Sequence, residues 1–150
     1  MKYKTMIAAV LTAVVAGCYS PDGNNSTEEE AAMEASPVEG VSFQMIETNG
    51  ISMRIAASSN EGPVVLLVHG WPESWYSWRH QIPALIEAGY KVVIPEMRGY
   101  GKTDAPESVD SYDVVHLAKD LVGVLDAIGA EKANIVGHDW GSIVAANTVL

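Results

Sequence analysis

Short apolar runs alternate with segments of helical spacing, and this alternation constrains the fold more than any other feature of the chain. Val64 to Val68 is an unbroken apolar run, which is typical of a strand buried on both faces. Predicted strands and helices then follow one another in the order 64–68, 75–88, 90–95, 114–128, 133–136 and 142 onward. This order predicts an α/β fold with a mostly parallel sheet that helices cover on both faces.

A β-hairpin is predicted ahead of this alternating region. Two strand-like segments, 41–48 and 51–58, flank the dipeptide Asn49-Gly50. Asparagine followed by glycine is a strong signal for a two-residue hairpin turn, because both positions need a left-handed backbone. We therefore expect an antiparallel pair beside the parallel strands, and we predict a folded region that covers residues 41–150.

The first 17 residues have the layout of an export signal. Lys2 and Lys4 precede an apolar run of 11 residues, 6–16, which is too short to span a bilayer as a helix. The sequence Val-Ala-Gly-Cys at 15–18 resembles the lipobox of bacterial lipoproteins. This resemblance implies cleavage before Cys18, acylation of Cys18 and a lipid anchor in the bacterial cell envelope. The alternative is a plain secretory signal with an incidental cysteine.

Residues 18–40 are predicted to form a flexible acidic tether. The segment holds six of the 19 acidic residues, no basic residue and few apolar side chains, so it cannot bury enough area to offset the entropy of ordering. The whole chain has a net charge of −10, which argues against nucleic acid as a partner. A single cysteine excludes an internal disulfide and a cysteine-rich metal site. We expect no cofactor and no metal.

The motif Gly-His-Asp-Trp-Gly at 137–141 lies between the last predicted strand and the helix after it. A nucleophile elbow needs small residues two positions before and two after the nucleophile, and Gly137 and Gly141 satisfy that spacing around Asp139. The dipole of the following helix favours an ionised carboxylate at Asp139. Alternatively, Asp139 is a simple helix N-cap, which is a common role for aspartate.

A second motif, formed by His69, Gly70, Trp71 and Pro72, follows the buried strand 64–68 directly. In α/β-hydrolases the oxyanion hole combines the backbone N–H after the nucleophile with one from this strand-to-helix loop. The donors here would be the backbone N–H groups of Trp140 and Trp71. A structural role for His69 in this turn is compatible with that interpretation.

Three motifs in this order resemble the soluble epoxide hydrolase family of α/β-hydrolases. They are His-Gly-Trp-Pro-Glu-Ser-Trp-Tyr-Ser-Trp-Arg at 69–79, Arg-Gly-Tyr-Gly at 98–101 and Gly-His-Asp-Trp-Gly at 137–141. The match extends over nearly all of 41–150, and one departure is Glu96, where relatives generally carry aspartate. The resemblance implies Asp139 as the nucleophile, a small apolar epoxide as the substrate and a diol as the product.

An aspartate suits this chemistry because attack on an sp³ carbon by a carboxylate gives an ester, which water can hydrolyse, whereas serine would give an ether. Haloalkane dehalogenases share the Asp-Trp pair but usually place asparagine at the position of Trp71, so a halide substrate is the alternative. Serine hydrolase activity is disfavoured, because no Gly-x-Ser-x-Gly occurs in the chain.

The fold places the relay acid and the histidine base after the nucleophile in the chain. They and the lid would lie beyond Leu150, only 11 residues after Asp139, so we expect this chain to be the N-terminal half of a longer hydrolase. Turnover is expected only of the longer parent. A non-catalytic, lipid-anchored remnant is the competing hypothesis. The sequence leaves the oligomeric state and the choice of inner or outer membrane open.

Overall fold

The computed structural model describes residues 34–148. The predicted signal peptide 1–17, Cys18 and residues 19–33 of the predicted tether lie outside the described residues. The elements, in chain order, are β1 Glu34–Ala35, β2 Val41–Thr48, β3 Ile51–Ser58, β4 Val64–Val68, the 3₁₀ helix η1 Trp75–Trp78, α1 Gln81–Glu87, β5 Lys91–Pro95, the 3₁₀ helix η2 Val109–Tyr112, α2 Val114–Ala127, β6 Ala133–Gly137 and α3 Trp140–Thr148. None of the helices in 34–148 has the length and apolar character needed to cross a membrane.

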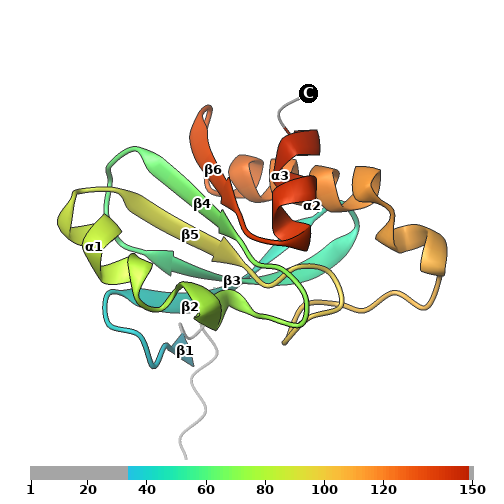
Figure 1. The fold of residues 1–150 in the computed structure, drawn as a ribbon, viewed down its shortest axis with the longest axis horizontal. Helices are drawn as coiled ribbons and strands as arrows, with labels where there is room; N and C mark the ends of the chain where they lie inside the picture. The colour runs from blue at the N-terminus through green and yellow to red at the C-terminus, as the bar shows by residue number, and fades with distance from the viewer. Residues whose placement is uncertain (1–33, 149–150) are drawn as a thin grey trace, which may run out of the picture. The chain divides into compact units, whose positions relative to one another are not determined.

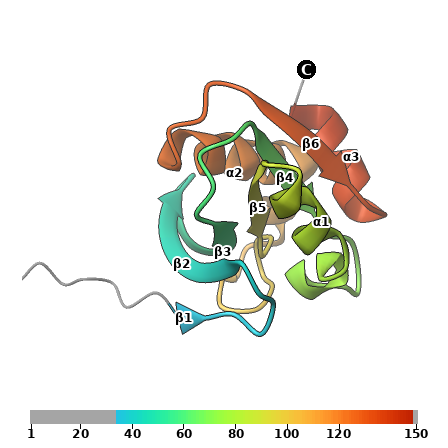
Figure 2. The same ribbon diagram turned by 90° about the vertical axis from the view of Figure 1, so that its left-hand side faces the viewer.

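The six strands form one sheet in the order β1-β2-β3-β5-β4-β6. Strand β4 pairs in parallel with β5 on one side and with β6 on the other, whereas the pairs β1–β2, β2–β3 and β3–β5 are antiparallel. In Figure 2, β1 and β6 lie at opposite ends of the sheet. The predicted α/β class is confirmed, and within residues 34–148 the sheet is mixed, since the N-terminal strands add antiparallel pairs.

The side chains of strand β4 enter two hydrophobic cores, one on each face of the sheet. Leu66 and Val68 pack with residues of α2 and α3, whereas Val65 and Leu67 pack with residues of η1 and α1. Figure 1 shows α1 on one side of β4 and β5, and α2 with α3 on the other. Successive side chains of a strand point to opposite faces. A strand covered on both faces therefore has no position left for a polar residue.

The β2–β3 hairpin and β1, which lies in the segment predicted as tether, form the end of the sheet opposite β6. Asn49 and Gly50 both have positive φ, 44° and 77°, as the predicted two-residue turn between β2 and β3 requires. Within the segment predicted as tether, β1 pairs with β2, and Val38 is buried in the same core cluster as Phe43. Residues 34–40 therefore belong to the folded unit, because β1 pairs with β2 and Val38 packs in this core cluster.

The predicted helix 75–88 is divided in the structure. A 3₁₀ turn, η1, ends at Trp78, and α1 begins at Gln81, so Pro83 lies in the first turn of α1. Proline has no N–H to donate, and the first turn is where a helix leaves such donors unpaired. A single helix through 75–88 would place Pro83 in the interior. Helix α3 begins at Trp140, two residues before the predicted start at Ser142.

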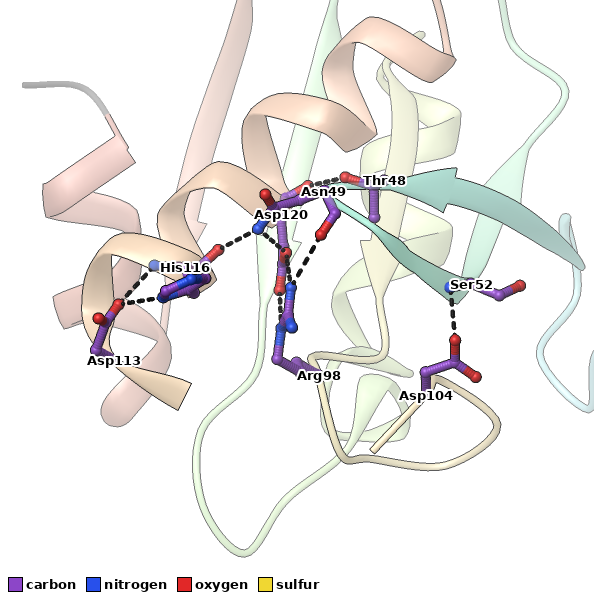
Figure 3. Close-up of polar contacts among 8 residues, drawn as sticks. All are labelled: Thr48, Asn49, Ser52, Arg98, Asp104, Asp113, His116 and Asp120. Atoms are coloured by element: carbon purple, nitrogen blue, oxygen red, sulfur yellow. Dashed lines mark hydrogen bonds and ion pairs between the residues drawn. The ribbon is translucent and has the colours of Figure 1, made fainter. Parts of the chain in front are cut away.

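A buried ion pair and its hydrogen bonds join three distant segments on the side of the sheet that α2 covers (Figure 3). In the loop after β5, Arg98 donates from Nε and Nη2 to the two carboxylate oxygens of Asp120 in α2, at 2.9 and 2.6 Å. Asn49 of the hairpin turn donates to the same carboxylate at 2.8 Å, and the hydroxyl of Thr48 donates to the backbone carbonyl of Asp120. The Arg98 and Asp120 side chains are only 4% and 2% exposed. The hairpin, the loop and α2 are therefore held at one carboxylate.

Substituting Asp120→Asn should lower the free energy of unfolding by about 3–5 kcal/mol, because the guanidinium of Arg98 stays buried without its counter-charge. Urea titration monitored by circular dichroism measures the change. The exposed Asp126→Asn on the same helix is the matched control and should alter the free energy of unfolding little. The double variant Arg98→Met with Asp120→Leu should recover most of the loss. An equal loss in the double variant would show that the charge pair is not the cause.

Candidate active site

Asp139 stands in a sharp turn between β6 and α3. Its backbone is left-handed, with φ 53°, a conformation that a residue with a side chain seldom adopts. A Cβ atom built on Gly137 would lie 2.4 Å from the carbonyl oxygen of Gly141, and one built on Gly141 would lie 2.4 Å from that of Val68. The turn therefore has the geometry that the glycine spacing predicts, and neither glycine can carry a side chain without moving the backbone.

The loop after β4 meets this turn directly. A Cβ on Gly70 would lie 2.5 Å from the Cβ of Asp139, so glycine is needed here for the close approach. The backbone N–H of Trp71 donates to Oδ1 of Asp139 at 2.9 Å. Strands β4 and β6 create the contact, because Val68 and Gly137 are partners at the ends of adjacent parallel strands.

Backbone N–H groups stabilise the ionised form of Asp139. The N–H of Trp140 and then that of Trp71 hold the pKa of the Asp139 carboxyl below its ordinary value, since both favour the ionised form. The two backbone groups predicted as oxyanion donors are the same two that act on its side chain.

The role of Asp139 as a simple N-cap does not account for these contacts. An N-cap side chain accepts from the N–H of the second or third helical residue. In α3 those residues are Gly141 and Ser142, and their N–H groups donate instead to the backbone carbonyls of His138 and Asp139. The carboxylate of Asp139 is directed instead to the loop after β4, where it accepts the N–H of Trp71.

His69 is fully buried and has a structural part in the site. Its Nε2 accepts the backbone N–H of Met97 at 3.2 Å, so the ring proton resides on Nδ1, which donates to the carbonyl of Gly70 at 3.0 Å. Burial lowers the pKa of His69, because the charged ring would be desolvated. The neutral ring connects the loop after β4 to Met97 in the loop after β5.

A cleft of about 530 Å³ opens beside Asp139. Its lining residues are Trp71, Tyr100, Asp139, Trp140, Ser142 and Ile143. The sequence motifs anticipated the Asp139 and tryptophan positions, but Tyr100 was not identified as a site residue. The available signal was the Arg-Gly-Tyr-Gly motif, which placed Tyr100 in a loop without showing which way that loop folds.

His138 belongs to a different cleft. Its Nδ1 lies 3.1 Å from Oε2 of Glu73, and both side chains line a smaller cavity with Ser77, Trp78 and Gln81. His138 therefore takes no place in the cleft that Asp139 lines, although the two residues are adjacent in sequence. Within residues 34–148 no group of three or more histidine, cysteine or acidic side chains is arranged to hold a metal ion.

Comparison with known proteins finds a matching family and relatives that share the name epoxide hydrolase. Residues 63–150 match the family described as alpha/beta hydrolase fold. Epoxide hydrolase A of Mycobacterium tuberculosis is 52% identical over 108 residues, which are 71% of this chain and 34% of that protein. Epoxide hydrolase 3 of Siraitia grosvenorii is 58% identical over 100 residues, 67% of this chain and 31% of that protein.

A solved structure supports the same relationship. The crystal structure of epoxide hydrolase A from Mycobacterium thermoresistibile superposes with a TM-score of 0.71 at 52% sequence identity, covering 73% of this chain and 35% of that one. The chain spans about a third of the length of these relatives.

The lowered pKa of His69 predicts how stability depends on pH. The unfolded state binds a proton near the ordinary value of about 6.5, whereas the folded state resists protonation, so acidification through that value favours unfolding. The stabilisation is complete above about pH 6.5 and is lost as the pH falls below it.

Urea titrations at about pH 7.5 and about pH 5.5 should therefore show a smaller loss on acidification for His69→Gln than for the wild type. The exposed His80→Gln is the matched control and should retain the wild-type loss. Equal pH dependence in His69→Gln and the wild type would refute the assignment.

Proposed function

Because this chain belongs to the α/β-hydrolase family, we propose that the protein opens epoxides to diols through a covalent ester on Asp139. One observation carries the proposal. The carboxylate of Asp139 lies in a left-handed elbow with Oδ1 against the backbone N–H of Trp71, beside an open cleft. The names of two relatives at 52% and 58% sequence identity support an epoxide as the substrate class.

In the first step of the proposed reaction, Asp139 attacks an epoxide carbon. Oδ1 is engaged by the N–H of Trp71, which leaves Oδ2 as the attacking oxygen. The new bond joins Oδ2 to carbon, the carbon–oxygen bond of the ring breaks, and the ring oxygen takes a proton to become the first hydroxyl. We place the acid that supplies this proton outside residues 34–148.

In the second step, water attacks the carbonyl carbon of the ester. Oδ1 then becomes the oxyanion, and it already lies at the N–H of Trp71 with the N–H of Trp140 nearby. Preformed donors of this kind contribute about 2.7–4 kcal/mol each to transition-state stabilisation. Collapse of the intermediate releases the diol with one oxygen from Asp139, and the carboxylate keeps one oxygen from water. The base that activates this water also lies, in this proposal, outside residues 34–148.

The substrate is proposed to be small and apolar. Trp71, Trp140 and Ile143 give the cleft an apolar wall, and these three residues are 71%, 41% and 47% exposed. A haloalkane substrate would need a pair of hydrogen-bond donors for the leaving halide. Haloalkane dehalogenases usually carry asparagine as one of these donors, whereas this chain has the indole of Trp71 at that position. The epoxide is therefore the better-supported substrate.

Isotope labelling tests the covalent mechanism in the intact protein, which is the longer parent expected from the sequence. In a single turnover in ¹⁸O-labelled water, the diol should carry no label and Asp139 should gain one labelled oxygen, because the ester is cleaved at its acyl carbon. Mass spectrometry of the product and of the peptide holding Asp139 gives both readings. Label in the diol and none in Asp139 would mean that water attacks the epoxide directly.

Two substitutions complete this test. Asp139→Ala should abolish turnover, since the ester can no longer form. The exposed Asp110→Ala removes an equivalent side chain away from the cleft and should leave turnover unchanged. Turnover in neither the wild type nor the control would favour a non-catalytic protein instead, and release of halide from chloroalkanes alone would favour the dehalogenase.

For the location of the protein we propose lipid attachment at Cys18 in the bacterial cell envelope. The support is the sequence at 15–18 and the short apolar run before it. Several acyl chains on one residue give stable membrane attachment, which a single chain does not. Cys18→Ser should therefore move the protein from the membrane fraction to the soluble fraction of exporting cells. An unmodified thiol at Cys18 in mature envelope protein, found by mass spectrometry, would contradict the anchor.

A further inference from the structure

We propose that Tyr100 is a specificity-determining residue of the Asp139 cleft, whose hydroxyl donates a hydrogen bond to an acceptor atom that the substrate carries next to its epoxide ring. The inference rests on the proposed function and names a feature of the substrate that the proposed mechanism does not require. Its basis is the position, the free hydroxyl and the fixed backbone of Tyr100.

The position of Tyr100 comes from packing between two loops. Its ring meets the ring of buried His69 edge-on, with centroids 4.7 Å apart and planes at 73°. The same side chain lines the cleft that Asp139 lines. Tyr100 thus packs on the buried histidine that supports the floor of the site while still facing the space where a substrate would lie.

The hydroxyl of Tyr100 is available as a donor. Within residues 34–148 it makes no hydrogen bond, whereas the other hydroxyl of the cleft, on Ser142, donates to the backbone carbonyl of Asp139 at 2.6 Å. Partial burial and the negative charge of Asp139 raise the pKa of Tyr100, which keeps the phenol protonated. A neutral donor next to a carboxylate nucleophile attracts an acceptor atom of the substrate.

The backbone around Tyr100 is fixed before any substrate binds. Its N–H donates to the carbonyl of Met97 at 2.9 Å, and its carbonyl accepts from Thr103 at 3.0 Å. The same loop is attached to α2 through Arg98 and to β3 through Glu96, whose carboxylate pairs with Arg54. Little conformational entropy remains to be lost when the hydroxyl binds, so the hydrogen bond is available to distinguish substrates.

A matched pair of epoxides isolates this hydrogen bond. Phenyl glycidyl ether carries an ether oxygen one carbon from the epoxide, and 1,2-epoxy-4-phenylbutane has a methylene at that place. In the intact protein, Tyr100→Phe should lower kcat/KM for the ether by about 3- to 10-fold and leave the methylene analogue almost unchanged, as expected for loss of one neutral hydrogen bond. Phenylalanine keeps the ring that packs on His69, so the melting temperature should stay constant.

The matched control is Tyr90→Phe, which removes the hydroxyl of a tyrosine packed against the core cluster of η1 and α1. This variant should leave kcat/KM unchanged for both epoxides. Equal losses for the two epoxides, no loss for either, or an unfolded Tyr100→Phe protein would overturn the role of Tyr100 while leaving the proposed function standing. If wild-type protein opens neither epoxide nor any other, the proposed function fails, and the inference about Tyr100 fails with it.

Discussion

The backbone of the β4 loop and the backbone of the elbow approach each other more closely than side chains would allow, and the site depends on this approach. Glycine at positions 70 and 141 removes the Cβ atoms that would collide with Asp139 and with the end of β4. The parallel pairing of Val68 with Gly137 then brings the N–H of Trp71 to the Asp139 carboxylate. With the N–H of Trp140, this contact lowers the pKa of Asp139, and it directs the carboxylate toward the loop after β4 beside the cleft.

Local patterns in the sequence were sufficient for much of the fold and for the nucleophile turn. The apolar run of β4, the Asn49-Gly50 turn and the glycine spacing around Asp139 each act within a few residues, so their structure could be predicted. The role of Tyr100, the burial of Val38 and the pairing of Arg98 with Asp120 depend on segments far apart in the chain. No short-range pattern carries that information, and Pro83 divided a helix whose apolar spacing gave no sign of it.

Glu96 shows how the fold accommodates a residue longer than the aspartate expected from the resemblance. Its carboxylate binds the guanidinium of Arg54 through two oxygens, at 2.8 and 2.6 Å, and accepts the N–H of Lys102 at 2.9 Å. The extra methylene carries the carboxylate across the loop to Gly101, where a Cβ atom would lie 2.0 Å from it. Glutamate therefore fits at position 96 because the facing residue is glycine, and the loop that holds Tyr100 keeps a buried anchor.

The separation of the site's parts along the chain has a kinetic consequence. The β2–β3 hairpin closes across a two-residue turn, whereas Trp71 and Asp139 are 68 residues apart. Closing a longer loop costs more chain entropy before any contact can compensate, and contacts between distant residues form slowly. The hydrogen bond from the N–H of Trp71 to the carboxylate of Asp139 is one of these distant contacts. During folding the hairpin and the helices can form before the Trp71–Asp139 contact does. A signal from secondary structure should therefore appear before Asp139 has reached its place in the site.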